Sequence, residues 1–209
     1  KDYIMFTGSM VAIATPMNED GSIDFASYEN LIEFHISNST DAIVPVGTTG
    51  ESATIDNAEH CEIVSFVVDK VAKRIPVIAG TGANSTSEAI ALTKYAYEAG
   101  VDGCLSVTPY YNKPTQEGLY QHYKAIANSV PVPLIPYNVP GRTSCDMLPS
   151  TVKKFLKIDN IVAVKEAIGD LQRIKELVDI CGEKINILSG DDLTAMDALL
   201  LGGKGVITV

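Results

Sequence analysis

Eight short apolar runs rich in β-branched residues recur along this chain, each followed by turn residues and then by a helical pattern. The runs are nearly continuous rather than alternating, which is typical of parallel strands that are covered on both faces. Their starts lie roughly thirty residues apart, a spacing that suits repeated βα units. Eight units in succession favour a closed (β/α)8 TIM barrel of the α/β class over an open doubly wound sheet, which more typically has about five or six strands. The runs begin at Ser9, Asp41, Pro76, Gly103, Pro133, Asn160, Ile185 and Gly205.

Local signals between the runs mark the ends of the expected helices. Residues 56–59 (DNAE) and 85–88 (STSE) have the pattern of capping boxes, in which side chains at both ends of the first turn satisfy free backbone N–H groups. Gly100 follows a helical pattern where a left-handed residue is favoured, and Pro149 suits the first turn of another helix. These signals support helices in the segments that join the strands.

No linker or change in composition divides the chain, so we expect residues 1–209 to form a single (β/α)8 barrel domain. The last apolar run, residues 205–209, ends the sequence, and no helical pattern follows it. A complete barrel normally has about 200 to 400 residues and a helix after its eighth strand. We therefore expect this chain to lack the C-terminal helical region of a complete barrel.

The charge and the cysteines limit the classes of partner. The chain has 16 Lys and Arg residues against 26 Asp and Glu residues, a formal net charge of −10. Such a chain is repelled by a phosphate backbone, and without a Lys/Arg cluster no nucleic-acid partner is expected. No apolar stretch reaches the roughly 18 to 20 residues that span a bilayer, so no membrane association is expected. The four cysteines lie far apart without a CxxC pattern, which indicates reduced, buried thiols in a cytoplasmic protein.

In a barrel of this kind the reactive groups gather at the carboxyl ends of the strands. Lys165 follows the apolar residues 161–164, so its ammonium group is expected to project from the end of a buried strand. Burial disfavours the charged form and lowers the pKa, which leaves a free amine that can attack a ketone and form a Schiff base. The alternative is a lysine that extends to solvent or pairs with Glu166 or another carboxylate.

Polar side chains at neighbouring strand ends could assist this amine. Tyr137 ends the preceding strand and could transfer protons, with help from the hydroxyl groups of Thr48, Thr49 and Tyr111. Taken singly, the tyrosines could instead line a wall and the threonines could cap turns. Arg142, in the loop after the fifth strand, has a planar fork that suits a substrate carboxylate. A surface ion pair is the alternative for this arginine.

The sequence gives no good metal site. Asp191 and Asp192 follow the seventh strand and are interpreted as a helix N-cap rather than as metal ligands. Residues 59–62 (EHCE) lie on one helix, where consecutive side chains face different directions. We therefore predict no bound metal.

Four motifs together make the chain recognisable: GTTGES at 47–52, VTPYYNKP at 107–114, YNVPGRT at 137–143 and VKEA at 164–167. In this order and spacing they resemble the dihydrodipicolinate synthases, pyruvate-dependent enzymes of the N-acetylneuraminate lyase-like class I aldolase superfamily. The similarity runs from Phe6 to the end of the chain. It implies the (β/α)8 barrel and a lyase-type reaction of lysine and diaminopimelate biosynthesis.

The resemblance also implies roles for individual residues. Lys165 would form a Schiff base with pyruvate, and the enamine would add to L-aspartate-4-semialdehyde to give 4-hydroxy-tetrahydrodipicolinate. Tyr137 would transfer protons through Thr48 to Tyr111, and in family members this last tyrosine reaches the site of the neighbouring subunit. The family is mostly homotetrameric, as a dimer of dimers, and uses no metal or organic cofactor. The substrate contacts implied are Thr49, Arg142, Gly190 and Ile207.

Many relatives are inhibited by lysine at a site near the dimer interface. Asn57 stands where lysine-sensitive bacterial enzymes often have histidine, which is a departure from the family pattern. The residues of this chain that match the lysine site are Ser52, Ala53, His60, Gly82, Asn84, Glu88 and Tyr110.

Two other functions fit parts of the pattern. N-acetylneuraminate lyase and the 2-keto-3-deoxy sugar-acid aldolases share the lysine and the tyrosine. Arg142 and the adjacent Tyr110 and Tyr111 favour the synthase, because a small aldehyde that bears a carboxylate needs a cationic anchor. A non-catalytic ligand-binding barrel is the alternative from another class, and the matching lysine, tyrosine and threonine argue against it.

Overall fold

The computed structural model describes residues 3–209, and all of its strand pairs are parallel. The eight strands are hydrogen-bonded in the order β2-β1-β8-β7-β6-β5-β4-β3. A bridge between Ile43 and Val77 links the two outer strands of this order, so the sheet forms a nearly closed barrel. Each of the eight predicted runs overlaps one strand, and β1 begins one residue before its run, which confirms the predicted (β/α)8 fold. The strands are β1 (Gly8–Ala12), β2 (Ala42–Val44), β3 (Ile78–Gly80), β4 (Gly103–Val107), β5 (Leu134–Asn138), β6 (Ala163–Glu166), β7 (Asn186–Ser189) and β8 (Gly205–Thr208).

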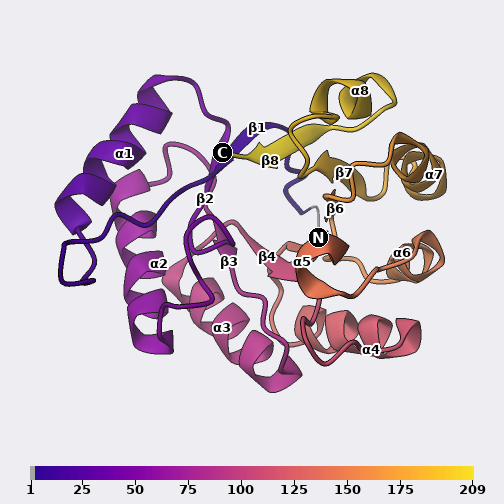
Figure 1. Ribbon diagram of the computed structural model, residues 1–209, viewed down its shortest axis with the longest axis horizontal. Helices are drawn as coiled ribbons and strands as arrows, with labels where there is room; N and C mark the ends of the chain where they lie inside the picture. Colours follow the sequence, from indigo (N-terminus) through magenta and orange to yellow (C-terminus); the bar gives the residue numbers. More distant parts are fainter. Residues whose placement is uncertain (1–2) are drawn as a thin grey trace.

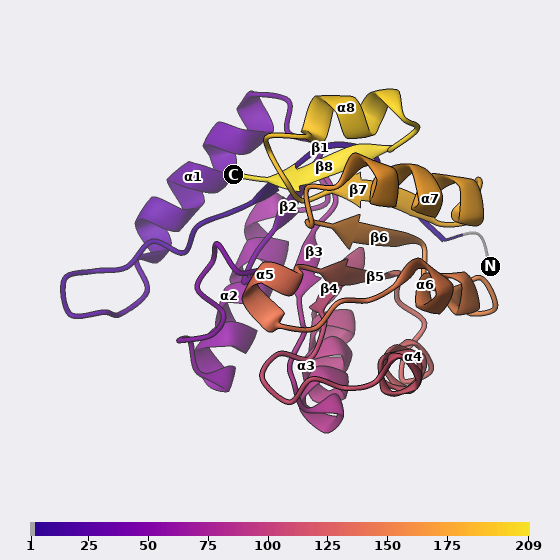
Figure 2. The same cartoon turned by 45° about the vertical axis from the view of Figure 1, so that its right-hand side comes forward.

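Helices surround the strands, and the short α5 lies at one end of them (Figure 1). A second view shows α5 beside the carboxyl ends of β5 and β6 (Figure 2). No helix in residues 3–209 is long and apolar enough to cross a membrane. The helices are α1 (Phe25–Ser37), α2 (Asn57–Val71), α3 (Thr86–Ala99), α4 (Gln116–Ala127), α5 (Pro140–Thr143), α6 (Pro149–Phe155), α7 (Leu171–Cys181) and α8 (Ala195–Leu200).

The apolar core has two parts, one on each face of the barrel wall. Because successive strand residues point to opposite faces, most strands contribute to both parts. On β6, Ala163 belongs to the interior cluster, whereas Val164 packs in the layer between the strands and the helices. On β4, Leu105 and Cys104 are divided in the same way. Burial on both faces explains why the strands are continuous apolar runs in the sequence.

The predicted helix signals are confirmed with one exception. Asp56 caps α2 through the N–H groups of residues 58 and 59, and the Glu59 side chain completes the capping box. Ser85 caps α3, with its Oγ accepting from the Glu88 N–H at 3.5 Å. The box predicted at 85–88 is wrong in its second half, because the Glu88 carboxylate lines a cavity next to His60 instead. Gly100 ends α3 with φ 93°, and α6 begins at a proline, both as predicted.

All four cysteines are free thiols, in agreement with the prediction. Cys104, Cys145 and Cys181 are buried, whereas Cys61 is only partly covered, so the prediction of burial is wrong for that residue. Burial raises the pKa of Cys104 to about 12 and that of Cys181 to about 11. These thiols are therefore protonated and unreactive at neutral pH.

Candidate active site

Lys165 on β6 and Tyr137 on β5 lie side by side at the carboxyl end of the barrel. The two residues are direct partners in the parallel pairing of β5 with β6. The Lys165 Nζ lies 4.2 Å from the centroid of the Tyr137 ring, and each residue is only 6% exposed. The strand pairing thus places the amine and the phenol in one shielded site, as the sequence predicts.

Burial lowers the pKa of the Lys165 amine from 10.5 to about 8, and the nearby Asp192 carboxylate opposes this shift. A substantial fraction of the amine is therefore uncharged near neutral pH, which a nucleophilic amine requires. Lys165 does not form the alternative ion pair with Glu166. Glu166 follows on the opposite face of β6 and bonds to Asn138.

The phenol of Tyr137 remains protonated at neutral pH. Burial raises its pKa, while the Arg142 charge and the nearby Thr48 hydroxyl act in the opposite direction. The Glu166 carboxylate on the far side of the sheet adds to the rise. Tyr137 thus offers a protonated phenol beside the amine, with a hydroxyl and a cation nearby that can stabilise its phenolate.

A strained turn after β2 brings Thr48 and Thr49 to the same end of the barrel. Val46 adopts φ 47°, a conformation that a β-branched residue rarely takes. A Cβ on Gly80 would lie 2.2 Å from the Val46 carbonyl oxygen, so β3 needs a glycine where this turn crosses it. The turn directs the chain so that both threonines line the cavity that contains Lys165.

Arg142 lies on α5, a single helical turn, and not in the loop that the sequence analysis expects. Pro140 occupies the first position of this turn, where its fixed φ favours a helix. Arg142 lines the cavity that contains Lys165 and forms no ion pair within residues 3–209. Its guanidinium group is therefore available to an anionic ligand.

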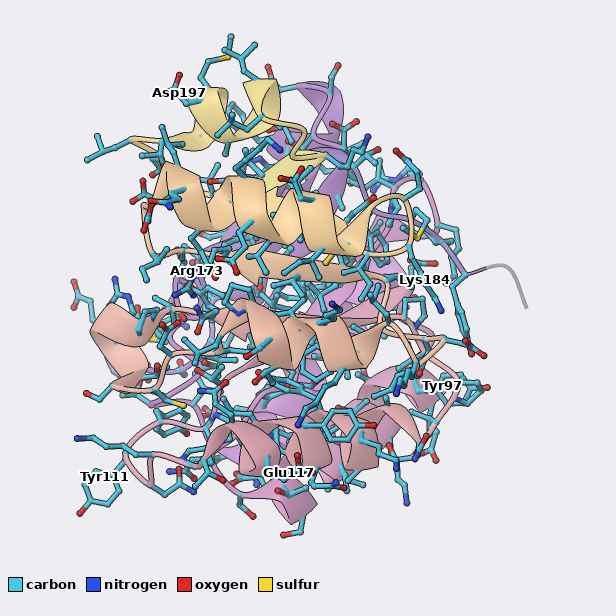
Figure 3. The ribbon with its side chains drawn as sticks, turned by 90° about the vertical axis from the view of Figure 1, so that its right-hand side faces the viewer. Tyr97, Tyr111, Glu117, Arg173, Lys184 and Asp197 are labelled. Atoms are coloured by element: carbon cyan, nitrogen blue, oxygen red, sulfur yellow. The ribbon has the colours of Figure 1, made fainter. Side chains whose placement is uncertain are left out.

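A cavity of about 270 Å³ at the carboxyl ends of the strands brings together most of the predicted site. Tyr111 is the exception: it is 89% exposed, has φ 73° and projects away from the barrel (Figure 3). Its hydroxyl group therefore does not reach Tyr137 within one chain. The predicted residues that line the cavity are Thr48, Thr49, Tyr137, Arg142, Lys165, Gly190 and Ile207.

Asp192 also lines this cavity, and the sequence analysis missed it. The interpretation of Asp191 and Asp192 as an N-cap is wrong, because the N-cap of α8 is Thr194. Asp191 accepts from the Thr194 N–H and hydroxyl, whereas Asp192 accepts from the Thr208 hydroxyl and faces the Lys165 charge. Within residues 3–209, no group of three or more His, Cys, Asp or Glu side chains is arranged to hold a metal ion.

Gly190 leaves the space that the Lys165 side chain occupies, and this gives a first prediction. A Cβ at position 190 would lie 2.5 Å from the Lys165 Cε and 2.9 Å from the Ala167 Cβ. Gly190→Ala should therefore displace the amine and lower kcat by about a hundredfold, measured by steady-state kinetics on folded protein. Gly118→Ala on α4 is the matched control, because a Cβ there would lie 3.3 Å from the Pro114 Cβ and 3.4 Å from the Thr115 Oγ1. Unchanged kcat in Gly190→Ala would show that the amine position is not set by this glycine.

A second cavity of about 400 Å³ adjoins the first, and Thr48 and Arg142 line both. His60 is buried in its wall; burial lowers the pKa of this histidine and the Glu88 carboxylate opposes the shift. Asn84 is the one residue of the predicted lysine site that does not line it, and its Nδ2 donates to the Tyr110 carbonyl at 3.2 Å. The remaining residues of that predicted site line this cavity together with Asn57, namely Ser52, Ala53, His60, Gly82, Glu88 and Tyr110.

Comparisons with known proteins place this chain in a family. Residues 5–209 match the model of the dihydrodipicolinate synthetase family. The chain is 66% identical to the 4-hydroxy-tetrahydrodipicolinate synthase of Thioalkalivibrio sulfidiphilus over 205 residues, which are 98% of this chain and 70% of that protein. The pyruvate complex of the chloride-inhibited dihydrodipicolinate synthase from Acinetobacter baumannii superposes with a TM-score of 0.96 at 55% identity, over 97% of this chain and 70% of that one. The lysine-bound synthase from Cyanidioschyzon merolae superposes with a TM-score of 0.94 at 42% identity, over 97% of this chain and 69% of that one. The chain belongs to the dihydrodipicolinate synthetase family.

Proposed function

We propose that this protein condenses pyruvate with L-aspartate-4-semialdehyde to give 4-hydroxy-tetrahydrodipicolinate, as a lyase of the class I aldolase type. The observation that carries the proposal is the buried Lys165 amine, 4.2 Å from the Tyr137 ring centroid, in a cavity that Arg142 also lines. The names of the relatives support the same reaction, and the Acinetobacter baumannii enzyme is a pyruvate complex.

The chemistry needs only the side chains of the chain and the two substrates. The Lys165 amine adds to C2 of pyruvate, and loss of one water gives the imine. Loss of a proton from C3 gives an enamine, whose C3 forms a carbon–carbon bond to the aldehyde carbon of the semialdehyde while the new alkoxide takes up a proton. The amino group of the semialdehyde then attacks the imine carbon, which closes the ring and releases the lysine.

Tyr137 is the proposed proton carrier for these steps. Its raised pKa keeps the phenol protonated, and Thr48 and Arg142 stabilise the phenolate when the proton is given up. Tyr111 is too exposed to take part within its own chain. We propose that it completes the Tyr137–Thr48 relay of a second copy of the chain, in a homotetramer built as a dimer of dimers.

Arg142 is proposed to bind the carboxylate of the semialdehyde, and Thr49 with the backbone at Ile207 to bind pyruvate. Arg142→Ala should raise KM for the semialdehyde about ten- to a hundredfold, because a charge-assisted hydrogen bond to the carboxylate is lost. Formation of the pyruvate adduct, followed by reduction with borohydride and intact-mass spectrometry, should persist with a loss of less than about fivefold, because Arg142 acts on this step only through the Tyr137 phenolate. Equal losses in both steps would remove this role from Arg142.

The choice of acceptor tests the function directly. The protein, loaded with pyruvate, is offered L-aspartate-4-semialdehyde or N-acetylmannosamine in parallel, and the products are identified by mass spectrometry. The proposal predicts a product with the semialdehyde only. Turnover of N-acetylmannosamine in its place would favour N-acetylneuraminate lyase activity, and a chain that forms no adduct with pyruvate would act as a ligand-binding barrel.

The second cavity is proposed to bind lysine as a feedback inhibitor. A related synthase has lysine bound in its crystal structure, and residues of the predicted lysine site line this cavity. The Glu88 carboxylate offers an anionic partner to the ammonium groups of lysine, and Asn57 provides an uncharged amide. Thr48 and Arg142 line both cavities, so a ligand in one contacts groups that serve the other. The proposed location of the enzyme is the cytoplasm, which suits its four free thiols.

A further inference from the structure

A buried polar network lies directly behind the Lys165–Tyr137 pair, on the outer face of β5 and β6. Asn138 and Glu166, which follow these two residues in sequence, are paired in the same parallel register. Because side chains alternate along a strand, Tyr137 and Lys165 face the barrel interior while Asn138 and Glu166 face the helices. The network thus touches the same two strand ends as the reactive pair, without lining the cavity.

Glu166 is at the centre of this network and is only 2% exposed. Both of its carboxylate oxygens accept from the Asn138 Nδ2 at 3.0 Å, and Oε1 also accepts from the Ile168 N–H at 3.1 Å. The Arg173 Nη1 lies 3.7 Å from Oε2. Glu166 therefore links β6, in which it lies, to β5 and to α7.

Asp146 closes the network from the segment that joins α5 to α6. It accepts from both terminal nitrogens of Arg173, at 3.0 and 2.9 Å, and from the Asn138 Nδ2 at 2.9 Å (Figure 3 labels Arg173 on α7). The Asn138 Oδ1 in turn accepts from the Met147 N–H at 2.9 Å. Every polar atom of the Asn138 amide thus has a partner, so its orientation is fixed.

We propose that Glu166 is a positioning residue, which joins the ends of β5 and β6 through Asn138 and so holds the Lys165 amine against the Tyr137 ring. This inference rests on the proposed function, because it assigns a role in the reaction of Lys165 with pyruvate. Burying a carboxylate costs free energy, and removing one of its hydrogen-bond partners leaves buried polar groups unsatisfied. Here the carboxylate joins the two strands that carry the reactive side chains.

The pKa shifts of Glu166 and Tyr137 indicate that the network affects the reactive pair as well as the stability of the fold. Burial raises the pKa of Glu166 to about 7, with Asn138 and Arg173 opposing the rise and Asp146 adding to it. The Glu166 charge also raises the pKa of Tyr137 across the sheet. Loss of this carboxylate therefore alters the position of the amine and the acidity of its neighbour together.

The test compares Glu166→Gln with the wild-type protein. The change keeps the length of the side chain but replaces one carboxylate oxygen, an acceptor, with an amide donor, which opposes the Asn138 amide donor. A structural role alone predicts a loss of stability with an unchanged reaction rate per folded molecule, whereas a positioning role predicts a loss of that rate.

The readout is the rate at which folded protein forms a borohydride-reducible pyruvate adduct, with the KM for pyruvate measured in parallel. We expect Glu166→Gln to lower the rate about ten- to a hundredfold with KM changed less than about threefold, because the cavity is intact while the amine is misplaced. Glu117→Gln, which breaks the exposed pair with Lys154, is the control and should keep the wild-type rate.

Asn138→Ala supplies the same readout if Glu166→Gln does not fold, since it removes the amide that joins Glu166 to β5. A rate per folded molecule within about twofold of wild type in Glu166→Gln or Asn138→Ala overturns the positioning role. A wild-type chain that forms no adduct contradicts the proposed function itself, and adduct formation that is equal in wild type and variants contradicts only this inference.

Discussion

Lys165→Met should reduce synthase activity by at least about a thousandfold, because the variant keeps the length and apolar stem of the side chain but has no nucleophile. The structure places this amine in the cavity with Tyr137 and Arg142. The residual rate, measured by product formation from pyruvate and the semialdehyde, should approach that of the uncatalysed reaction. Activity within about tenfold of wild type would show that another group carries the reaction.

The same variant also has a predicted effect on stability, which separates lost chemistry from lost folding. Burial lowers the pKa of Lys165 from 10.5 to about 8 in the folded protein. The unfolded chain therefore binds more protons than the native state between these two pKa values, and the native state gains stability from this group as the pH rises from about 8 to 10.5. Lys165→Met lacks this gain, so its free energy of unfolding should rise less than that of wild type over the same interval. Parallel denaturant titrations at both pH limits measure the difference.

Tyr137→Phe should lower kcat by about a hundred- to ten-thousandfold, the range for loss of a group that transfers protons in the transition state. The phenylalanine ring can still pack against the Lys165 amine, which lies 4.2 Å from the ring centroid, so the fold and the site should persist. Adduct formation with pyruvate should continue at a reduced rate, because water can replace the phenol poorly as a proton donor.

Tyr123→Phe, which removes a buried tyrosine hydroxyl in the outer core away from the cavity, is the matched control for loss of a phenol group. It should lower the melting temperature and leave kcat per folded molecule near the wild-type value. A Tyr137→Phe variant with a kcat within about threefold of wild type would remove the phenol from the proposed proton transfer.

The barrel could be predicted from the sequence because its strands are buried on both faces. A run such as residues 161–164 has no polar position, so the run itself marks a central parallel strand and its end marks the mouth of the barrel. Lys165 stands out for that reason: it is the first charged residue after such a run. The same rule predicts Thr48, Thr49 and Tyr137 at neighbouring strand ends, and these three line the same cavity.

Features that depend on packing between distant segments could not be predicted in this way. Asp191 and Asp192 look alike in sequence, and only the approach of β8 turns Asp192 toward Lys165. The position of Glu88 in the second cavity follows from α2 and α3 packing together, which brings His60 beside it. Tyr111 is expected near Thr48 both from its place after the fourth strand and from the resemblance, but its side chain is exposed on its own chain.

The Asn138–Glu166 pair shows the same limit. Asn138 follows Tyr137 in the sequence, and Glu166 follows Lys165. A polar residue at the end of an apolar run is typical of an ordinary turn, so neither residue indicates a partner. Their pairing requires the β5–β6 register and the Asp146–Arg173 contact, which joins segments 27 residues apart. Alternation along the strand does give one clue, because a carboxylate next to an inward lysine must face the helix layer, where it needs partners.

The pH dependence of adduct formation at Lys165 tests the central claim most directly. The protein is incubated briefly with pyruvate at a series of pH values, reduced with borohydride under one common condition, and digested so that the modified peptide is located by mass spectrometry. A poorly hydrated amine predicts modification of Lys165 alone, with a rate that rises with pH through a midpoint at about 8 and then levels off. A rate that keeps rising toward 10.5, the value of an ordinary lysine, or an adduct on another lysine would contradict it.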